Sequence, residues 1–185
     1  MAFFSRRWYP PLAKIVCKFS TRPPRTGQES FSALGKRYEE SCQGLLASLG
    51  LSTRLVGGAS DGGVDLVGHW QLETALTVSV VAQCKKIGRS CPPVYLRELE
   101  GTLTRHPAGT LGILLCSSAA SKASLAALNG SPTPLAFIHF DAETLCSIVL
   151  NGAVQTLLPR LIIASRHVRG RVEPVLFYRT ASPAS

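Results

Sequence analysis

Two short stretches of the sequence carry polar residues at spacings that suit phosphodiester chemistry. Asp61-Gly-Gly-Val-Asp65 opens one predicted strand, and Gln83 and Lys85 close the next one. Side chains alternate along a strand, so Gln83 and Lys85 share one face while Cys84 takes the other. A carboxylate, an amide oxygen and a lysine gathered at neighbouring strand ends could hold a hard divalent cation and activate water for phosphodiester cleavage.

Simpler interpretations of the same residues stay open at this level. Asp-Gly-Gly is also typical of an ordinary turn that Asp61 caps. The apolar run 78–82 before Gln83 indicates a buried strand, where an amide and a lysine cost desolvation free energy unless they have partners. Asp65 on the neighbouring strand would be such a partner, so a plain Asp65–Lys85 ion pair accounts for the pattern equally well.

A further acidic residue comes from the first predicted helix, residues 30–49, in which apolar residues recur at helical spacing. Tyr38 and Cys42 belong to its apolar stripe. Glu39 lies at the edge of that stripe and Glu40 points further towards solvent. Glu39 can therefore lean over the sheet end and complete an acidic cluster. A solvated helix glutamate is an equally good interpretation of Glu39 and a better one of Glu40.

The elements that must position these residues follow from hydrophobic periodicity and turn signals. The predicted order is a helix, three strands, a helix and a buried strand, followed by a helix, a strand and a last helix. This α-β-β-β-α-β core predicts an α/β fold with a mixed central sheet flanked by helices. The predicted ranges are 30–49 (helix), 51–56, 64–70 and 75–83 (strands), 93–104 (helix), 111–116 (strand), 121–128 (helix), 135–140 (strand) and 142–150 (helix).

The bulk composition predicts one globular domain without a membrane span. The chain has 185 residues, 45% of them apolar, and no apolar run approaches the length that a transmembrane helix needs. Residues 1–26 carry six of the nine net positive charges and no acidic residue, which leaves +3 for the rest. That arginine-rich, acid-free start is typical of a mitochondrial presequence. A basic arm that binds phosphate and is retained would have the same composition.

The remaining sequence divides into a domain over residues 27–151 and a basic, partly disordered C-terminal extension over residues 152–185. Six cysteines are scattered without any CxxC spacing, which favours free thiols in a reducing compartment over a disulfide framework or a zinc site. Four histidines are isolated from one another, and we assign none of them to a metal.

Four segments together resemble the Mrr-type branch of the PD-(D/E)xK nuclease superfamily. They are Gly35-Lys-Arg-Tyr-Glu39, Leu45-Leu-Ala-Ser-Leu-Gly50, Ser60-Asp-Gly-Gly-Val-Asp-Leu-Val67 and Val81-Ala-Gln-Cys-Lys85, and the similarity runs to about Leu145. With its basic leader the chain is also similar to the mitochondrial family named required for respiratory growth protein 7. The resemblance implies a restriction-endonuclease-like fold and magnesium-dependent nuclease chemistry.

Carried over by residue, the resemblance implies a metal aspartate at Asp65, a helix acid at Glu39, a second-strand ligand at Gln83 and a lysine at Lys85. Asp65 and Glu39 would hold Mg²⁺ (or Mn²⁺), Gln83 would position the metal or its water, and Lys85 would orient the nucleophile or stabilise the phosphorane charge. Many superfamily members have an acid at the Gln83 position. The neutral amide is usual in the Mrr branch, and it leaves Glu39 to supply the missing charge.

Substrate affinity must come from cationic side chains that contact phosphates. Lys86, Arg89 and Arg97 follow the motif and could line a backbone groove, with Arg54 and Arg105 as weaker candidates, although a solvated charge explains each of them singly. We expect moderate, salt-sensitive and largely sequence-independent binding of DNA rather than RNA, in the mitochondrial matrix, with a homodimer left open. The alternative is a catalytically inactive relative that binds nucleic acid or a protein partner in mitochondrial gene expression or respiratory assembly.

Overall fold

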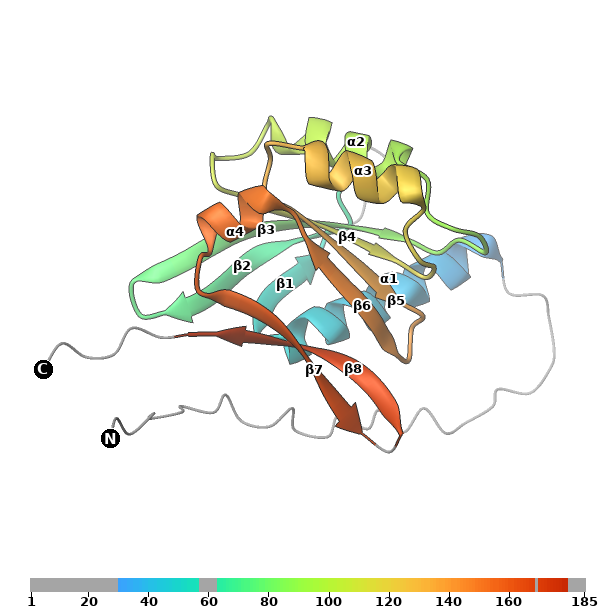
Figure 1. The fold of residues 1–185 in the computed structure, drawn as a ribbon. Helices are drawn as coiled ribbons and strands as arrows, with labels where there is room; N and C mark the ends of the chain where they lie inside the picture. The colour runs from blue at the N-terminus through green and yellow to red at the C-terminus, as the bar shows by residue number, and fades with distance from the viewer. Residues whose placement is uncertain (1–29, 57–62, 169, 180–185) are drawn as a thin grey trace, which may run out of the picture.

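The computed structural model describes residues 30–56, 63–168 and 170–179, so the leader and Asp61 lie outside the described residues. Within these ranges the chain forms four helices and eight strands (Figure 1). None of these helices is long and apolar enough to cross a membrane. The elements are α1 (Phe31–Ser48), β1 (Leu51–Leu55), β2 (Leu66–Glu73), β3 (Leu76–Lys85), α2 (Val94–Leu103), β4 (Leu111–Cys116), α3 (Lys122–Gly130), β5 (Leu135–Phe140), β6 (Leu145–Leu150), α4 (Gly152–Leu157), β7 (Leu161–Val168) and β8 (Arg171–Tyr178).

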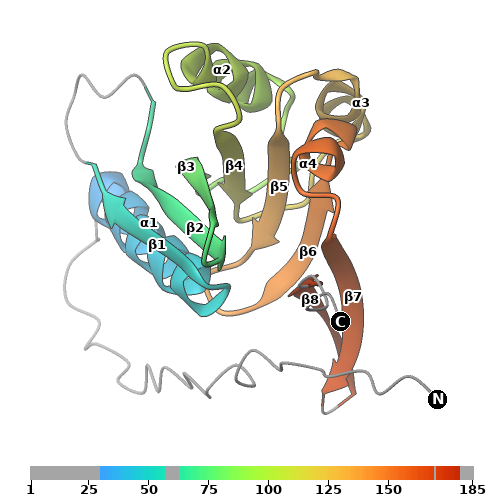
Figure 2. The ribbon, with the colours of Figure 1, turned by 90° about the vertical axis from the view of Figure 1, so that its left-hand side faces the viewer.

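Six strands form one mixed sheet in the order β1-β2-β3-β4-β5-β6. The β3–β4 and β4–β5 pairs are parallel, and the other three pairs are antiparallel. Helices α2 and α3 cover one face and α1 covers the other (Figure 2). The predicted α/β class, the mixed central sheet flanked by helices and the α-β-β-β-α-β core order are therefore confirmed.

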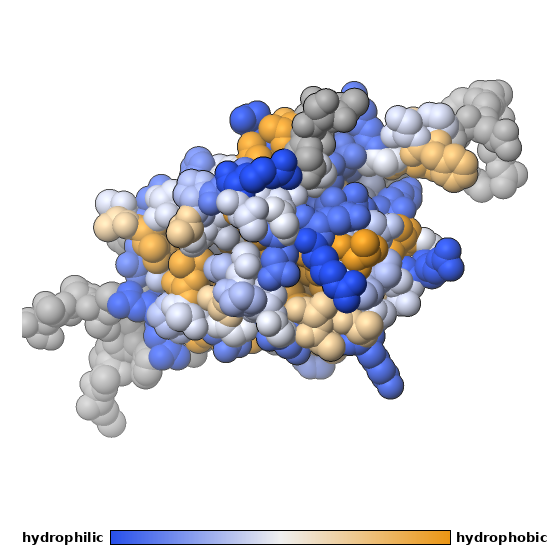
Figure 3. Space-filling model, turned by 90° about the horizontal axis from the view of Figure 1, so that it is seen from above, coloured by the Kyte–Doolittle hydropathy of each residue, from blue (hydrophilic) through white to orange (hydrophobic). Residues whose placement is uncertain are grey.

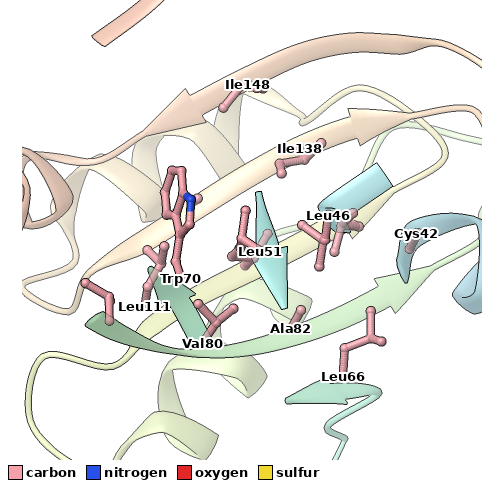
Figure 4. Close-up of a cluster of buried hydrophobic side chains, with 14 of the residues drawn as sticks. Cys42, Leu46, Leu51, Leu66, Trp70, Val80, Ala82, Leu111, Ile138 and Ile148 are labelled. Carbon is pink, nitrogen blue, oxygen red and sulfur yellow. The ribbon is translucent and has the colours of Figure 1, made fainter. Parts of the chain in front are cut away.

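Strand β3 supplies the hydrophobic core on both faces of the sheet. Val80 and Ala82 pack into the cluster under α1, together with Cys42 and Leu46 (Figure 4). Val81 packs into the second cluster, under α2 and α3. Because successive side chains of a strand point to opposite faces, the alternation divides the end of β3 as well. Cys84 accordingly packs into the cluster under α1. Gln83 and Lys85 lie on the opposite face, as the sequence predicted.

Helix α1 is fixed at both ends. The Ser30 hydroxyl accepts a hydrogen bond from Ala33 N–H at 3.2 Å and so caps the first turn. Gly50 follows the helix with φ of +86°, a conformation that glycine adopts without strain. The Tyr38 hydroxyl donates to Phe140 O at 2.8 Å and ties the N-terminal half of α1 to the end of β5. This contact fixes the part of α1 that carries Glu39 against the sheet.

The predicted helix over residues 142–150 is wrong, because Leu145–Leu150 is strand β6, antiparallel to β5. The Asp141 carboxylate accepts hydrogen bonds from Glu143 N–H at 3.1 Å and Thr144 N–H at 2.7 Å, and Ala142 has φ of +78°. These contacts form a tight turn between β5 and β6, and its backbone conformation is incompatible with a helix that starts at residue 142. The apolar spacing of this short segment fits a strand as well as a helix, and the turn decides between them.

Residues beyond 151, predicted to be a basic extension, contribute ordered elements. Asn151 caps α4 by accepting from Val154 N–H at 3.1 Å. Strands β7 and β8 form an antiparallel hairpin. Val154, Leu158 and Leu161 are buried in the same cluster as the core under α1. The fold therefore continues past residue 151 within the described residues.

Candidate active site

The start of β2 and the end of β3 lie side by side. Leu66 pairs with Ala82 in the antiparallel ladder, so Asp65 and Gln83 follow as neighbouring positions at the sheet end. Lys85 comes two residues later on the same face as Gln83. The structure therefore brings Asp65 beside Gln83 and Lys85, which follow it by 18 and 20 positions in the sequence.

Main-chain groups fix the position of Asp65. Its carboxylate oxygen Oδ2 accepts a hydrogen bond from the backbone N–H of Cys84 at 2.6 Å. Its own N–H donates to Ala82 O at 3.0 Å, and its carbonyl accepts from Val56 N–H at 2.9 Å. Hydrogen bonds to an ionised acceptor are among the stronger ones in proteins. The carboxylate thus continues the β2–β3 ladder beyond its last residue pair and lies between the two faces of the sheet.

The amide of Gln83 is buried, with 2% of the residue exposed. Its Oε1 has no hydrogen-bond partner among the described residues. A Cβ added at Gly63 would come within 3.0 Å of Gln83 Nε2, and Gly63 has φ of +83°, so both space and conformation require glycine there. A buried polar atom without a partner costs about 1–3 kcal/mol of folding free energy. Oε1 is therefore available to an incoming cation or water.

Lys85 is half-buried on the face that α2 covers. Its Nζ lies 5.3 Å from the ring centroid of Tyr95, in the first turn of α2. An ammonium over an aromatic face gains about 0.5–1 kcal/mol at sites open to solvent. Ser117 secures the strand end, since its N–H donates to Lys85 O at 3.0 Å and its hydroxyl accepts from Ile87 N–H at 2.8 Å. No sequence motif marked Tyr95 or Ser117.

Glu39 approaches the same strand end from the opposite face. It is half-buried on α1, whereas its neighbour Glu40 is exposed, as the helical periodicity predicted. The pKa of the Cys84 thiol is raised by a hydrogen bond with Cys42, by burial, and by the charges of Asp65 and Glu39. Glu39 is therefore close enough to Cys84 for its charge to act on the thiol. The two carboxylates therefore lie near one thiol, with Glu39 on the α1 side of β3 and Lys85 on the α2 side.

The donor atoms at this strand end fit a hard divalent cation. Mg²⁺ and Mn²⁺ favour oxygen ligands, and Asp65, Glu39 and Gln83 offer two carboxylates and an amide. Within residues 30–56, 63–168 and 170–179, no group of three His, Cys, Asp or Glu side chains could hold a metal by itself. A metal at this strand end would need the amide oxygen of Gln83 beside the two carboxylates, and the unpartnered state of that oxygen would suit the role.

The predicted phosphate contacts all lie at the surface. Lys86 and Arg89 belong to the segment between β3 and α2, and Arg97 belongs to α2; all three side chains are exposed. The Ser118 hydroxyl donates to Arg89 O at 2.6 Å and holds that segment against the chain after β4. Figure 3 looks onto the α2–α3 side, where hydrophilic and hydrophobic side chains are interspersed. Of the weaker candidates, exposed Arg54 lies on β1 and exposed Arg105 follows α2.

A groove lies away from this strand end, between α1 and the first two strands. It has a volume of about 910 Å³, and Glu40, Gln43, Thr53 and Arg54 are among the residues that line it. Gln43 Nε2 donates to Thr53 O at 2.8 Å along its floor. No candidate ligand lines it, so the groove gives no support to the metal chemistry.

A comparison of the sequence with known families matches the family described as required for respiratory growth protein 7 over residues 30–79 and 73–158. The chain belongs to this family. The two matched stretches run from the cap of α1 to the residue after α4 and include Glu39, Asp65, Gln83 and Lys85. The match to the required for respiratory growth protein 7 family thus extends beyond residue 151, and so do the helices and strands of the fold.

An uncharacterized mitochondrial protein of Schizosaccharomyces pombe is 38% identical over 122 residues, which are 65% of this chain and 46% of that protein. The chain therefore spans about half the length of this relative. Among solved structures, the MspJI restriction endonuclease in complex with a 27-mer oligonucleotide has a TM-score of 0.42 at 19% identity, over 56% of this chain and 24% of that one. The DNA modification-dependent restriction endonuclease AspBHI has a TM-score of 0.45 at 16% identity, over 60% and 32%.

Proposed function

We propose that this member of the required for respiratory growth protein 7 family is a mitochondrial, metal-dependent nuclease that hydrolyses DNA phosphodiesters. The observation that carries the proposal is the buried Oε1 of Gln83, which has no partner among the described residues. A buried oxygen without a partner costs folding free energy, and an ion or water that binds it would remove that cost. A cation held by Asp65, Glu39 and Gln83 would be that group.

Each residue has a distinct part in the proposed reaction. Bound Mg²⁺ would supply a Lewis acid for the phosphoryl oxygen and lower the pKa of a water nucleophile. Asp65 is oriented for binding by Cys84 N–H, so its carboxylate is set before the ion arrives. Lys85 has a positive charge on the α2 side, where it can orient the nucleophile or stabilise the charge that develops in the transition state.

The exposed cations Lys86, Arg89 and Arg97 would bind the phosphates on either side of the scissile bond. Such contacts release counterions, so affinity should fall steeply with salt and depend little on sequence. The mitochondrial location of the relative in Schizosaccharomyces pombe supports the same location for this chain, and we place it in the matrix. A role in mitochondrial genome maintenance accords with DNA binding and with a place in the matrix.

The second candidate function is a nuclease-like protein that binds nucleic acid or a protein partner without cleaving. One arrangement favours it: Glu39 and Lys85 lie on opposite sides of β3, and Lys85 Nζ is engaged with Tyr95. Under this alternative, Gln83 would tolerate loss of its amide and the cations would still bind phosphate.

A cleavage assay on the full chain separates the two functions. Plasmid, single-stranded DNA and RNA are incubated with Mg²⁺ or Mn²⁺ and wild type, Asp65→Ala or Lys85→Ala, with Glu40→Ala as the matched control on the exposed face of α1. The nuclease predicts metal-dependent cutting that Asp65→Ala and Lys85→Ala abolish and Glu40→Ala retains. Binding by wild type without cutting, unchanged in all three variants, would establish the alternative.

A further inference from the structure

Strands β7 and β8 form a two-stranded sheet of their own beside the six-stranded one. Leu161, Leu176 and Tyr178 pack against the core cluster under α1, so one face of the hairpin rests on the domain. The far end of the hairpin extends beyond the six-stranded sheet (Figures 1 and 2). A two-stranded hairpin by itself is only marginally stable in water. Its stability therefore depends on the surfaces that pack against it.

The hairpin gathers exposed apolar side chains. Ile162 and Phe177 are directly opposite in the ladder and are 39% and 52% exposed. They lie on the face turned away from the domain, because Leu161, one residue earlier, faces the core. Ile163 and Val172 are also exposed, at 37% and 57%. Single exposed apolar residues are normal, whereas a cluster of them marks an interaction surface.

The hydrogen-bond pattern of the hairpin shows which main-chain groups point outward. Arg179 N–H donates to Arg160 O at 3.0 Å, so these two residues, which flank the ladder in register, form a hydrogen-bonded pair. Hydrogen-bonded and non-hydrogen-bonded pairs alternate along an antiparallel ladder. Ser165 and Pro174 are therefore a non-hydrogen-bonded pair, and their main-chain groups point away from the hairpin. By the same alternation, the outward residues of β7 are Ile163, Ser165 and His167.

The edge of β7 differs from the other strand edges in having no protection. On β8, the outward residue Pro174 has no N–H to offer. On β1, Gln43 Nε2 donates to Thr53 O at 2.8 Å, and β6 has β8 packed beside it. The three outward residues of β7 are exposed, and no hydrogen bond among the described residues uses their main-chain groups. Proteins normally block such an edge, because it is a template for another strand.

We propose that β7 pairs antiparallel with β7 of a second copy of this chain, which makes one four-stranded sheet from the two hairpins. A strand that pairs antiparallel with its own copy presents the same edge from both sides, so one open edge per chain is sufficient. The new sheet places β8 at both of its outer edges, where Pro174 interrupts further pairing. The assembly is therefore closed at two copies. The exposed Ile162 and Phe177 of both hairpins lie on one continuous face of this sheet.

The charges at β7 favour a second copy over a nucleic acid or an acidic peptide. Arg166, within the strand, donates to Glu173 Oε2 through Nε at 3.1 Å and through Nη2 at 2.9 Å. Arg160, directly before the strand, donates to Glu73 Oε1 at 3.0 Å. A polyanion would need these cations for its own phosphates or carboxylates. Two copies of a surface whose arginines are already paired meet without charge repulsion.

The interface is small, because it consists of one strand edge and a few apolar side chains. Interfaces smaller than the standard size are typical of weak, reversible complexes. We therefore expect a dimer with a dissociation constant on the order of micromolar. The inference does not rest on the proposed nuclease activity, since none of the hairpin residues belongs to the candidate active site.

Sedimentation velocity of the full chain over a micromolar concentration series tests the proposal. We expect wild type to shift from monomer to dimer with no larger species. Ser165→Pro removes one outward N–H that has no partner within the described residues. It should weaken the dimer at least about tenfold, since a symmetric interface contains the substitution twice. Ser165→Ala keeps the N–H and is the matched control, which should dimerise as wild type does.

A second pair of variants tests the apolar face. Ile162→Lys should also weaken the dimer at least about tenfold, because lysine on an edge strand opposes pairing. Val172→Lys places the same charge on an exposed residue of β8 and should leave the dimer intact. Circular dichroism confirms that each variant retains its fold.

Hydrogen exchange of wild type gives a test that needs no variant. Amides of residues 163–167 should exchange more slowly as the protein concentration rises, and those of residues 172–176 should not change. The proposal is overturned by a monomer at every concentration, by species that grow beyond the dimer, or by concentration-dependent protection outside β7. A dimer that Ser165→Pro and Ile162→Lys leave unchanged would overturn it as well.

Discussion

The two faces of the sheet at the end of β3 hold similar groups in opposite electrostatic surroundings. On the α1 face, Cys84 contacts Cys42 with Asp65 and Glu39 nearby, and its pKa is raised. On the α2 face, Lys85 pairs with Cys116 in the β3–β4 ladder, and the positive charge of Lys85 acts to lower the pKa of the nearby Cys91 thiol, against its hydrogen bond and its burial, which raise it. One strand thus separates a negative side from a positive one, through nothing more than the alternation of its side chains.

The comparison locates where a cation must bind if it is to use residues from both faces. Asp65 belongs to neither face, because its carboxylate continues the ladder at the strand end through Cys84 N–H. A cation that binds both Glu39 and Gln83 would therefore have to lie at this strand end, beside Asp65. If residues from both faces bind one cation, substitutions on either face should weaken its binding.

Gln83→Met should have the largest effect, and its two consequences should have opposite signs. The substitution removes an unpartnered buried oxygen at nearly constant volume, so stability should stay the same or rise by up to about 1–3 kcal/mol. Metal-dependent cleavage should fall on the order of 100-fold, since a ligand is lost. Thermal unfolding and cleavage are measured on the same preparation. A loss of stability together with full activity would mean that the amide has only a structural role.

Alkylation of Cys116 should have an unusual pH profile. With its pKa lowered to about 6, the thiolate predominates at pH 7, by more than about tenfold over an ordinary thiol. The rate should level off above that pH and fall as the pH drops through about 6. Cys146, exposed and with a raised pKa, is the control whose rate keeps rising beyond pH 9. Peptide mapping of the label measures both, and parallel profiles would show that the surroundings of Cys116 do not lower its pKa.

Glu39→Gln and Glu40→Gln form a matched pair on one helix. Glu39 is half-buried towards the strand end and Glu40 is exposed. If Glu39 supplies the charge that Gln83 lacks, its substitution should weaken Mn²⁺ binding by about tenfold or more, and that of Glu40 should leave it unchanged. Calorimetric titration measures both. Equal affinities would confine the metal site to the α2 face.

Tyr95 should have the smallest effect. Tyr95→Leu removes the ring under the Lys85 ammonium, which is worth about 0.5–1 kcal/mol, so kcat should fall about two- to fivefold with KM unchanged. Tyr95→Phe keeps the ring and should retain wild-type rates. Steady-state cleavage kinetics provide the measurement. Equal losses in both variants would point to the hydroxyl instead of the ring.

Much of this comparison could be predicted from sequence, because it depends on local periodicity. The period-two pattern of β3 separated Gln83 and Lys85 from Cys84, and the apolar runs of β4 and β5 predicted those strands to the residue. The helical period likewise distinguished Glu39 from Glu40. Each of these features is decided within a few residues of chain.

The features that the sequence did not predict depend on distant contacts or on turn chemistry. Cys91 pairs with Ala120, and Lys85 with Cys116, only because a parallel crossover through α2 returns the chain beside β3, and no spacing signals this. Tyr95 meets Lys85 for the same reason. Strand β6 has an apolar spacing that suits a helix, and the Asp141 turn overrides it.

Binding of Mn²⁺ to the full chain, followed by the electron paramagnetic resonance signal of the free ion, tests the central claim most directly. We predict that wild type binds Mn²⁺ at the end of β3 and that Asp65→Asn, which keeps an acceptor for Cys84 N–H but removes the charge, weakens this binding at least about tenfold. Glu40→Gln should bind as wild type does. Wild-type affinity in Asp65→Asn, or no binding by wild type, would contradict the account.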